Sequence, residues 1–172
     1  MPEFLKYVHV VIGNEEDADN VLGIKAEGTE VHAGQISHSA YPSVAQQICK
    51  QFDNVELVAI TLRESISANH NNWGAMLFER ASGLVCFSPL KEGGYSPYAI
   101  HNIVDRVGSG DSFAAGLIFA LCENSSDDLQ HKLDFAVAAS CLAHSIKGDF
   151  NYSAKSEVIA LMRGNQSGRV QR

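Results

Sequence analysis

Asp105-Arg106-Val107-Gly108-Ser109-Gly110-Asp111-Ser112-Phe113-Ala114-Ala115-Gly116 is the stretch from which both the fold and the chemistry can be argued. The residues before it predict a strand over 98–104, and the apolar spacing after it predicts a helix over 112–122. Two glycines therefore lie where a strand turns into a helix. Glycines let the backbone approach a ligand closely, and a helix start aims its N–H groups and its dipole at one point. The turn therefore predicts an anion site.

Asp111 follows these glycines and is expected in the first helical turn, beside the anion. A carboxylate there can take a proton from a hydroxyl while the amides hold the group under attack, which suits phosphoryl transfer. A simple N-cap aspartate after a glycine turn is the alternative interpretation. The stretch lacks the Gly-Lys-Ser/Thr ending of a P-loop and fails the Gly-x-Gly-x-x-Gly spacing. A serine nucleophile at Ser112 is disfavoured, because Ser112 lies inside the predicted helix.

The rest of the chain alternates between strand and helix patterns. We predict further strands over 8–12, 55–62, 73–78 and 84–87, and further helices over 15–22, 42–52, 129–141 and about 153–162. The segments 73–78 and 84–87 are typical of an antiparallel hairpin. Strands alternating with helices predict a layered α/β fold. The polar tail over 164–172 is expected to be frayed.

Composition excludes several classes of protein. The 172 residues are 45% hydrophobic, enough for a packed core, and carry a net charge of −7, which argues against bulk binding to nucleic acid. No apolar run is long enough to span a membrane, and no signal peptide is visible, so a cytoplasmic location with reduced thiols is expected. The four cysteines form no Cys-x-x-Cys pair, and Cys122 and Cys141 are predicted to be buried.

The stretch 105–116 resembles the C-terminal signature of the ribokinase/PfkB sugar kinases, written D-T-x-G-A-G-D-x-F-x-x-G. Asn14-Glu15-Glu16-Asp17 is similar to the N-x-x-E motif of that family, and 61–65 falls where the family has its nucleotide-contacting T-x-G turn. The wording of these segments looks most like the 2-keto-3-deoxygluconate kinase branch. The resemblance implies a ribokinase-like three-layer αβα sandwich, in its C-terminal portion, with a mostly parallel sheet and an antiparallel hairpin.

The resemblance also implies the catalytic roles. Asp111 would be the general base toward a sugar's primary hydroxyl, and the amides of Gly108, Ser109 and Gly110 would form the anion hole for the γ-phosphoryl group. ATP would be the phosphoryl donor, with 2-keto-3-deoxygluconate and its 6-phosphate as the most similar substrate and product. The nucleotide would be contacted by Asn14, Thr61, Arg63, Glu64 and Val137.

Metal and substrate contacts are implied at further positions. Asp17 and Glu16 would hold magnesium through water, and Asp105 with the loop at 147–148 matches a site for a monovalent cation such as K⁺. Arg106 and Asp149 would contact the substrate. Arg106 stands where the family usually has threonine. The alternative to a substrate contact is that the Arg106 side chain faces solvent. Asp17 is one methylene shorter than the family's glutamate, and Arg63 replaces the glycine of T-x-G.

The resemblance covers about residues 5–163, and 1–163 is expected to be the nucleotide-binding C-terminal half of a kinase domain. The N-terminal half and the lid of the family, with most of the sugar contacts, have no counterpart in the sequence. We therefore expect this chain alone to be a poor kinase, and to form a homo-oligomer or bind the missing half. The alternative is a non-catalytic nucleotide- or phosphate-binding fragment derived from such a kinase.

Overall fold

The computed structural model describes residues 1–24, 40–92, 94–123 and 128–164. The helices and strands in chain order are α1 (Pro2–Leu5), β1 (Val10–Gly13), α2 (Glu15–Leu22), α3 (Tyr41–Gln51), β2 (Leu57–Ser67), β3 (His70–Glu79), β4 (Val85–Ser88), β5 (Leu90–Lys91), β6 (Gly94–Tyr95), β7 (Tyr98–His101), α4 (Ser109–Cys122), α5 (Leu129–Ala143) and α6 (Lys155–Met162). None of the helices in these ranges is long and apolar enough to cross a bilayer. Of the predicted tail over 164–172, all but Gly164 lies outside the described residues.

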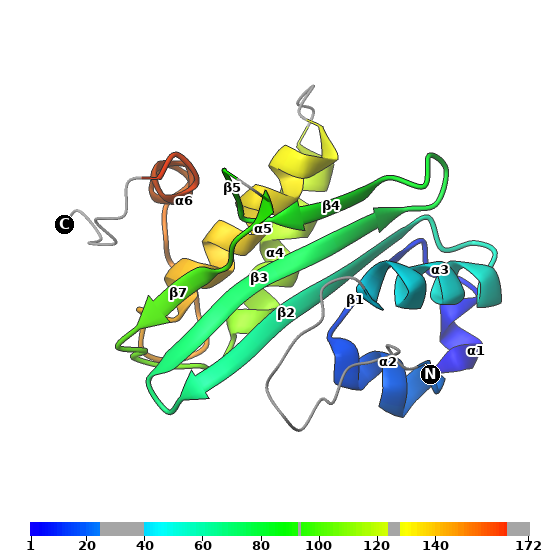
Figure 1. Cartoon of the computed structure of the whole chain (residues 1–172), viewed down its shortest axis with the longest axis horizontal. Coiled ribbons are helices and arrows are strands. Elements are labelled where there is room, and N and C mark those ends of the chain that lie inside the picture. Colours follow the sequence, from blue (N-terminus) through cyan, green and yellow to red (C-terminus); the bar gives the residue numbers. More distant parts are fainter. Residues whose placement is uncertain (25–39, 93, 124–127, 165–172) are drawn as a thin grey trace.

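A five-stranded sheet forms the centre of the molecule (Figure 1). β1 and β2 pair in parallel, whereas β3 pairs antiparallel with β2, with β4 and with β7. The sheet is thus mixed among the described residues, where the sequence predicted a mostly parallel one. The reason is the tight turn between β2 and β3, because a parallel neighbour would need a crossover of a dozen or more residues.

Helices cover both faces of the sheet, as the three-layer α/β prediction requires (Figure 1). Alternate residues of β2 and β3 point to opposite faces. One set packs with α3 into a core of which Val58, Leu62, Met76 and Ile48 are members. The other set packs against α4 and α5, and that core includes Ala59, Trp73, Leu77, Phe113, Leu117, Leu133 and Val137. The predicted α/β fold class is confirmed.

α2 has the predicted bounds, because its end signals are local. The Asn14 side chain accepts from the Asp17 N–H at 2.9 Å, and the Asp17 carboxylate accepts from the Asn14 N–H at 2.9 Å. This reciprocal capping box satisfies two N–H groups that a helix start leaves free. At the other end, Gly23 has φ +67°, the left-handed conformation that ends helices and that glycine adopts without strain.

Several other boundaries differ from the prediction. Among them, β3 begins at His70 and not at Trp73, and β7 ends at His101 and not at Val104. β2 continues to Ser67 instead of ending at Leu62, because β3 pairs with it beyond the core. α4 begins at Ser109, within the glycine stretch, and not at Ser112. α6 is capped at Ala154 and not at Ser153: the Glu157 carboxylate accepts from the Ala154 N–H at 2.8 Å.

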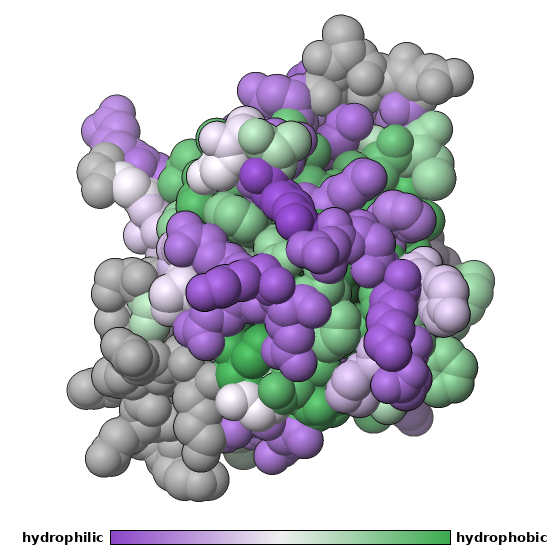
Figure 2. All heavy atoms as spheres, turned by 90° about the vertical axis from the view of Figure 1, so that its right-hand side faces the viewer, coloured by the Kyte–Doolittle hydropathy of each residue, from purple (hydrophilic) through white to green (hydrophobic). Residues whose placement is uncertain are grey.

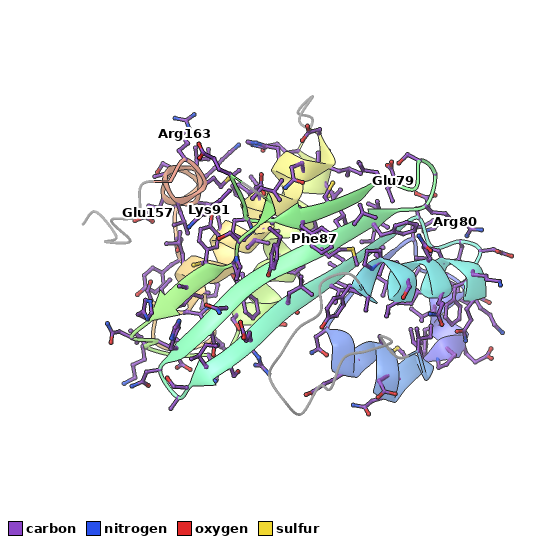
Figure 3. All side chains as sticks on the ribbon, in the orientation of Figure 1. Glu79, Arg80, Phe87, Lys91, Glu157 and Arg163 are labelled. Atoms are coloured by element: carbon purple, nitrogen blue, oxygen red, sulfur yellow. The ribbon has the colours of Figure 1, made fainter. Side chains whose placement is uncertain are left out.

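Arg80, the residue directly after β3, links that strand to the loop that follows α3. Figure 3 labels it beside α3, where its guanidinium donates to the Asp53 backbone oxygen and lies 3.2 Å from the Asp53 carboxylate. Asp53 is almost fully exposed, so the ion pair adds little stability by itself. The backbone contact sets the position of the sheet against α3.

Among the described residues β1 pairs with β2 alone, so its other edge is open. Beside that edge lies a hollow of about 370 Å³, lined mainly by apolar residues of α1, β1, α2 and β2. Phe4 and Tyr7 near the N-terminus are 71% and 81% exposed. Figure 2 views the molecule from this end, where hydrophobic side chains are visible between hydrophilic ones.

The thiols differ in exposure, which corrects one prediction. Cys49 and Cys86 are buried and Cys141 is half-buried, but Cys122, predicted to be buried, is exposed at the end of α4. The apolar pattern of α4 failed here, because α4 carries apolar residues on its outer face as well, and Cys122 shares that face with the exposed Ile118 and Phe119.

We predict one fast thiol in the native protein. Burial raises the pKa of Cys141 to about 12, and burial raises the pKa of Cys49 and of Cys86, so these thiols stay protonated at pH 8 and are at least half-buried. Titration with a chromogenic disulfide at pH 8 should show one equivalent reacting quickly and three more only in denaturant. Cys122→Ser should abolish the fast phase; a fast phase that survives this substitution would mean that one of the other three thiols is accessible.

Candidate active site

The predicted glycine turn lies between β7 and α4. Gly108 is the N-cap of α4 and has φ +77°. The Ser112 N–H already donates to the Gly108 oxygen at 2.8 Å, and the Ser109 N–H donates to Arg106 through a long bond of 3.4 Å. Among the described residues, the N–H groups of Gly110 and Asp111 donate no backbone hydrogen bond. These amides, at the positive end of a 14-residue helix, can bind an anion.

Gly108 is required by space as well as by its backbone angle. A Cβ atom at this position would lie 2.3 Å from the backbone oxygen of Asp149. The glycine therefore lets the loop around 147–151 approach the start of α4 directly. This contact brings Asp149 close to the anion turn.

Asp105 joins the same two loops through its carboxylate. One oxygen accepts from the N–H groups of Arg106 at 2.7 Å and Val107 at 3.1 Å, and the other accepts from the Gly148 N–H at 2.9 Å. The hydrogen bonds from these N–H groups hold the pKa of Asp105 below its usual range, and the bond from Gly148 has the largest effect. The carboxylate is thus ionised and placed at the predicted cation site beside 147–148.

Asp111 is exposed and lies on the rim of a second hollow, of about 370 Å³, between α4, α5 and α6. Asp149, Asn151 and Lys155 also line it. Asn151 donates to the Ser112 hydroxyl at 2.7 Å and to the Ala139 oxygen at 2.9 Å, which ties the loop to both helices. Lys155 bonds Glu123 and lies 5.5 Å from the centre of the Phe119 ring.

The residues implied in magnesium and nucleotide binding lie at another place. Asn14 and Asp17 begin α2 and border the hollow beside β1, and the Thr61 hydroxyl lies 3.5 Å from the Gly13 oxygen. Thr61 is therefore next to the Asn14 motif, as expected. The described residues contain no group of three or more His, Cys, Asp or Glu side chains that could hold a metal by themselves. Direct ligation of magnesium by such a cluster is thus not built into the described part of the chain.

Three residues implied in nucleotide binding have surroundings that the sequence did not indicate. Residues 61–65 form no turn: Arg63 and Glu64 lie within β2, opposite Trp73 and Asn72, because the hairpin continues past the core. The Glu64 carboxylate accepts from the Asn72 side chain at 2.7 Å. Val137 is fully buried in the core between α5 and the sheet, so its side chain cannot touch a nucleotide in this structure.

Arg106 has a contact that the sequence did not indicate. Its Nη2 atom donates to the backbone oxygens of Ser67 at 2.8 Å and Ala68 at 2.7 Å, in the turn between β2 and β3. This contact to two backbone oxygens was not among the alternatives drawn from the sequence, an anion contact and a side chain facing solvent. The partners are 38 and 39 residues away, so no local pattern could have revealed them.

Sequence reasoning also missed the supports that come from α5. The Ser140 hydroxyl donates to the Ser109 oxygen at 2.7 Å, and the backbone oxygen of His144 accepts from Val104 at 2.9 Å and Asp105 at 3.4 Å. His144 is 1% exposed, and its Nδ1 lies 2.9 Å from the Ser140 oxygen. The sequence signal was the polar character of Ser140 and His144, within and directly after the otherwise apolar second half of α5.

We predict that His144 makes stability pH-dependent. Burial keeps the pKa of His144 below its usual value of about 6.5, which it regains on unfolding. The unfolded chain therefore binds a proton before the folded one, and stability should fall as pH drops below about 6.5. The contribution of His144 to the slope of the free energy of unfolding against pH is at most about 1.4 kcal/mol per pH unit. Urea unfolding between pH 5 and 8 measures it; His144→Gln should flatten the curve, and an unchanged curve would refute the assignment.

Comparison with known proteins shows which family the chain resembles. Residues 80–154 match the pfkB family of carbohydrate kinases. The predicted resemblance to the PfkB kinases is confirmed. The structure of 2-dehydro-3-deoxygluconokinase from Thermotoga maritima is 44% identical to this chain, with a TM-score of 0.80, over 94% of this chain and 44% of that chain. No curated protein matched the sequence.

Two further PfkB-like structures share the fold. A PfkB family carbohydrate kinase from Listeria grayi is 27% identical, with a TM-score of 0.73, over 94% of this chain and 43% of that chain. A putative 2-keto-3-deoxygluconate kinase from Enterococcus faecalis is 23% identical, with a TM-score of 0.73, over 98% of this chain and 44% of that chain. The chain thus spans less than half the length of these relatives.

Proposed function

We propose that this chain carries the phosphoryl-transfer part of an ATP-dependent sugar or sugar-acid kinase, with 2-keto-3-deoxygluconate as acceptor and its 6-phosphate as product. One observation carries the proposal: Asp111 lies in the first turn of α4, directly after a glycine turn with free amides. The likeness to the 2-dehydro-3-deoxygluconokinase of Thermotoga maritima supports the choice of acceptor. 2-Dehydro-3-deoxygluconate is another name for 2-keto-3-deoxygluconate.

Asp111 takes the proton of the primary hydroxyl as its oxygen attacks the γ-phosphorus of ATP. The new oxygen–phosphorus bond forms while the bond to the bridging β,γ-oxygen breaks, and ADP leaves. The amides of Gly108, Ser109, Gly110 and Asp111, with the helix dipole, stabilise the charge on the transferring phosphoryl oxygens. Because Asp111 is exposed at the rim of a hollow, a hydroxyl can reach it without rearrangement of the core.

Magnesium would be held at the start of α2. Asn14, Glu16 and Asp17 offer oxygen atoms, the donors magnesium prefers, and contacts through water fit the lack of a direct carboxylate cluster in the described residues. Magnesium supplies charge neutralisation on the phosphates when bound. The ionised Asp105 beside 147–148 suits a monovalent cation such as K⁺. We propose that Asp149, whose backbone lies against Gly108, contacts the acceptor.

The open edge of β1 supports a proposal about partners. An unpaired strand beside an apolar hollow is a place where further strands can add. We infer that the remaining part of a kinase fold, or a second copy of this chain, covers it. A single monomeric species in sedimentation velocity at micromolar concentration would count against self-association. A cytoplasmic location, where ATP is present, goes with this proposal.

A coupled ADP-release assay on the full-length product of the gene tests the proposed reaction. The acceptors are 2-keto-3-deoxygluconate, ribose, fructose and adenosine, each with magnesium and ATP. We expect ADP release that depends on acceptor and is fastest with 2-keto-3-deoxygluconate. The alternative, a non-catalytic nucleotide- or phosphate-binding module, predicts ATP binding with no acceptor-dependent ADP release.

A further inference from the structure

The Arg106 side chain bridges the anion turn and the tip of the β2–β3 hairpin. One terminal nitrogen donates to two carbonyl oxygens, those of Ser67 and Ala68, at 2.8 and 2.7 Å. A terminal guanidinium nitrogen carries two N–H groups, so each carbonyl receives one of them. The hydrogen bonds are charge-assisted, and such bonds are stronger than neutral ones.

The hairpin tip meets the same segment through its backbone. The Ile103 N–H donates to the Asn69 oxygen at 3.3 Å. His70 pairs with His101 across β3 and β7, and the two rings lie 4.1 Å apart. The tip, although far from the cores, is therefore a fixed surface against which a loop can be held.

The opposite side of the turn is held by α5 and the following loop. Its contacts are the His144 oxygen with Val104 and Asp105, the Ser140 hydroxyl with Ser109, and Gly148 with Asp105. Arg106 supplies the matching contact on the hairpin side. The turn is thus fixed between two parts of the fold.

We propose that Arg106 is a positioning residue that clamps the anion turn against the β2–β3 hairpin and so sets the direction of the first α4 amides. It acts through the backbone of its own loop and not by touching the substrate. Its consequence for catalysis rests on the proposed kinase function, whereas the clamp itself does not.

Hydrogen exchange on the chain tests the clamp without any activity. Arg106→Met keeps most of the apolar stem and removes the donors. We expect the hydrogen-bonded amides within 67–70 and 103–109 to exchange about tenfold faster in this variant. Arg106→Lys keeps donors and charge, so its rates should lie nearer to those of the unmodified chain. Equal rates in the Met and Lys variants, or unmodified rates in the Met variant, would overturn the proposal.

Arg63→Met is the matched control for charge. Arg63 lies on the same hairpin but is exposed and within β2, so removing it takes away a nearby positive charge without touching the tip carbonyls. Exchange over 103–109 should stay within about twofold in this variant. A tenfold acceleration there would show that charge, and not the clamp, controls the turn, and would overturn the proposal.

Kinetics of the full-length product separate positioning from ligand binding. A clamp predicts that Arg106→Met lowers kcat about tenfold or more while KM for ATP and acceptor change less than about threefold, with partial rescue by Arg106→Lys. An arginine that grips a phosphate or a carboxylate predicts instead a large rise in KM with unchanged exchange, which would overturn the proposal. If the unmodified protein shows no kinase activity, the proposed function fails, and the exchange experiment still decides the clamp.

Discussion

Replacing Asp111 by Asn is expected to lower the turnover of the proposed kinase reaction by about 10²–10⁴-fold, the usual contribution of a general base. The amide cannot accept the hydroxyl proton, but it is similar in shape and is tolerated at a helix start. The amides of the turn remain in place, so ATP should still bind with similar affinity. Steady-state ADP release and a separate calorimetric titration with ATP measure the two quantities.

Asp53→Asn is the matched control, because it makes the same chemical change in an exposed ion pair with Arg80, on another part of the fold. It should leave turnover unchanged and cost at most about 1 kcal/mol of stability. Normal turnover in the Asp111 variant would remove the base assignment. Lost turnover together with lost ATP binding would indicate that the start of α4 had been deformed and would also contradict the assigned role of Asp111.

Gly108→Ala should have the largest effect on stability, about 2–5 kcal/mol. A left-handed backbone costs a non-glycine residue roughly 1–2 kcal/mol. The added methyl group also has to fit 2.3 Å from a backbone oxygen and 2.8 Å from the Cα of Asp149, and overpacking costs about 1–3 kcal/mol. For a chain of this size the melting temperature should fall by roughly 5–15 °C.

Gly83→Ala separates the strain from the clash. Gly83 has φ +72°, close to the +77° of Gly108, but a Cβ there would meet nothing within 4 Å. We expect it to lose only the roughly 1–2 kcal/mol of backbone strain. Similar melting temperatures for the two variants, measured by circular dichroism, would mean that the loop at 147–151 does not press on Gly108.

The sequence predicted the parts of the fold that depend on neighbouring residues. α2 has its capping residue, its acidic first turn and its closing glycine within ten positions, and its bounds were predicted correctly. The β3–β4 hairpin was predicted from two short apolar runs and a turn, and it is present. The outer half of β2 was missed, because residues such as Arg63 and Ile66 are exposed there and carry no burial pattern. Only pairing with β3 makes that half a strand.

The same distinction applies to the candidate site. The glycine turn and Asp111 could be found from the sequence because a strand, two glycines and a helix start are consecutive. The contacts that hold the turn could not, because Arg106 reaches 38–39 residues back and Asp105 reaches 43 residues forward. For Val137, the resemblance to the family implied a nucleotide contact, but in the described fold the residue lies in the core between α5 and the sheet.

The most direct test of the central claim, that the start of α4 binds the phosphates of ATP, is an NMR titration of this chain with magnesium and ATP. The start of α5 is an internal control, because the Asp128 side chain already accepts from the His131 N–H there at 2.8 Å. We predict that the amide shifts of Gly108, Gly110 and Asp111 change most, while those of the first turn of α5 stay in place. Unchanged shifts at Gly110 and Asp111, or equal changes at both helix starts, would contradict the claim.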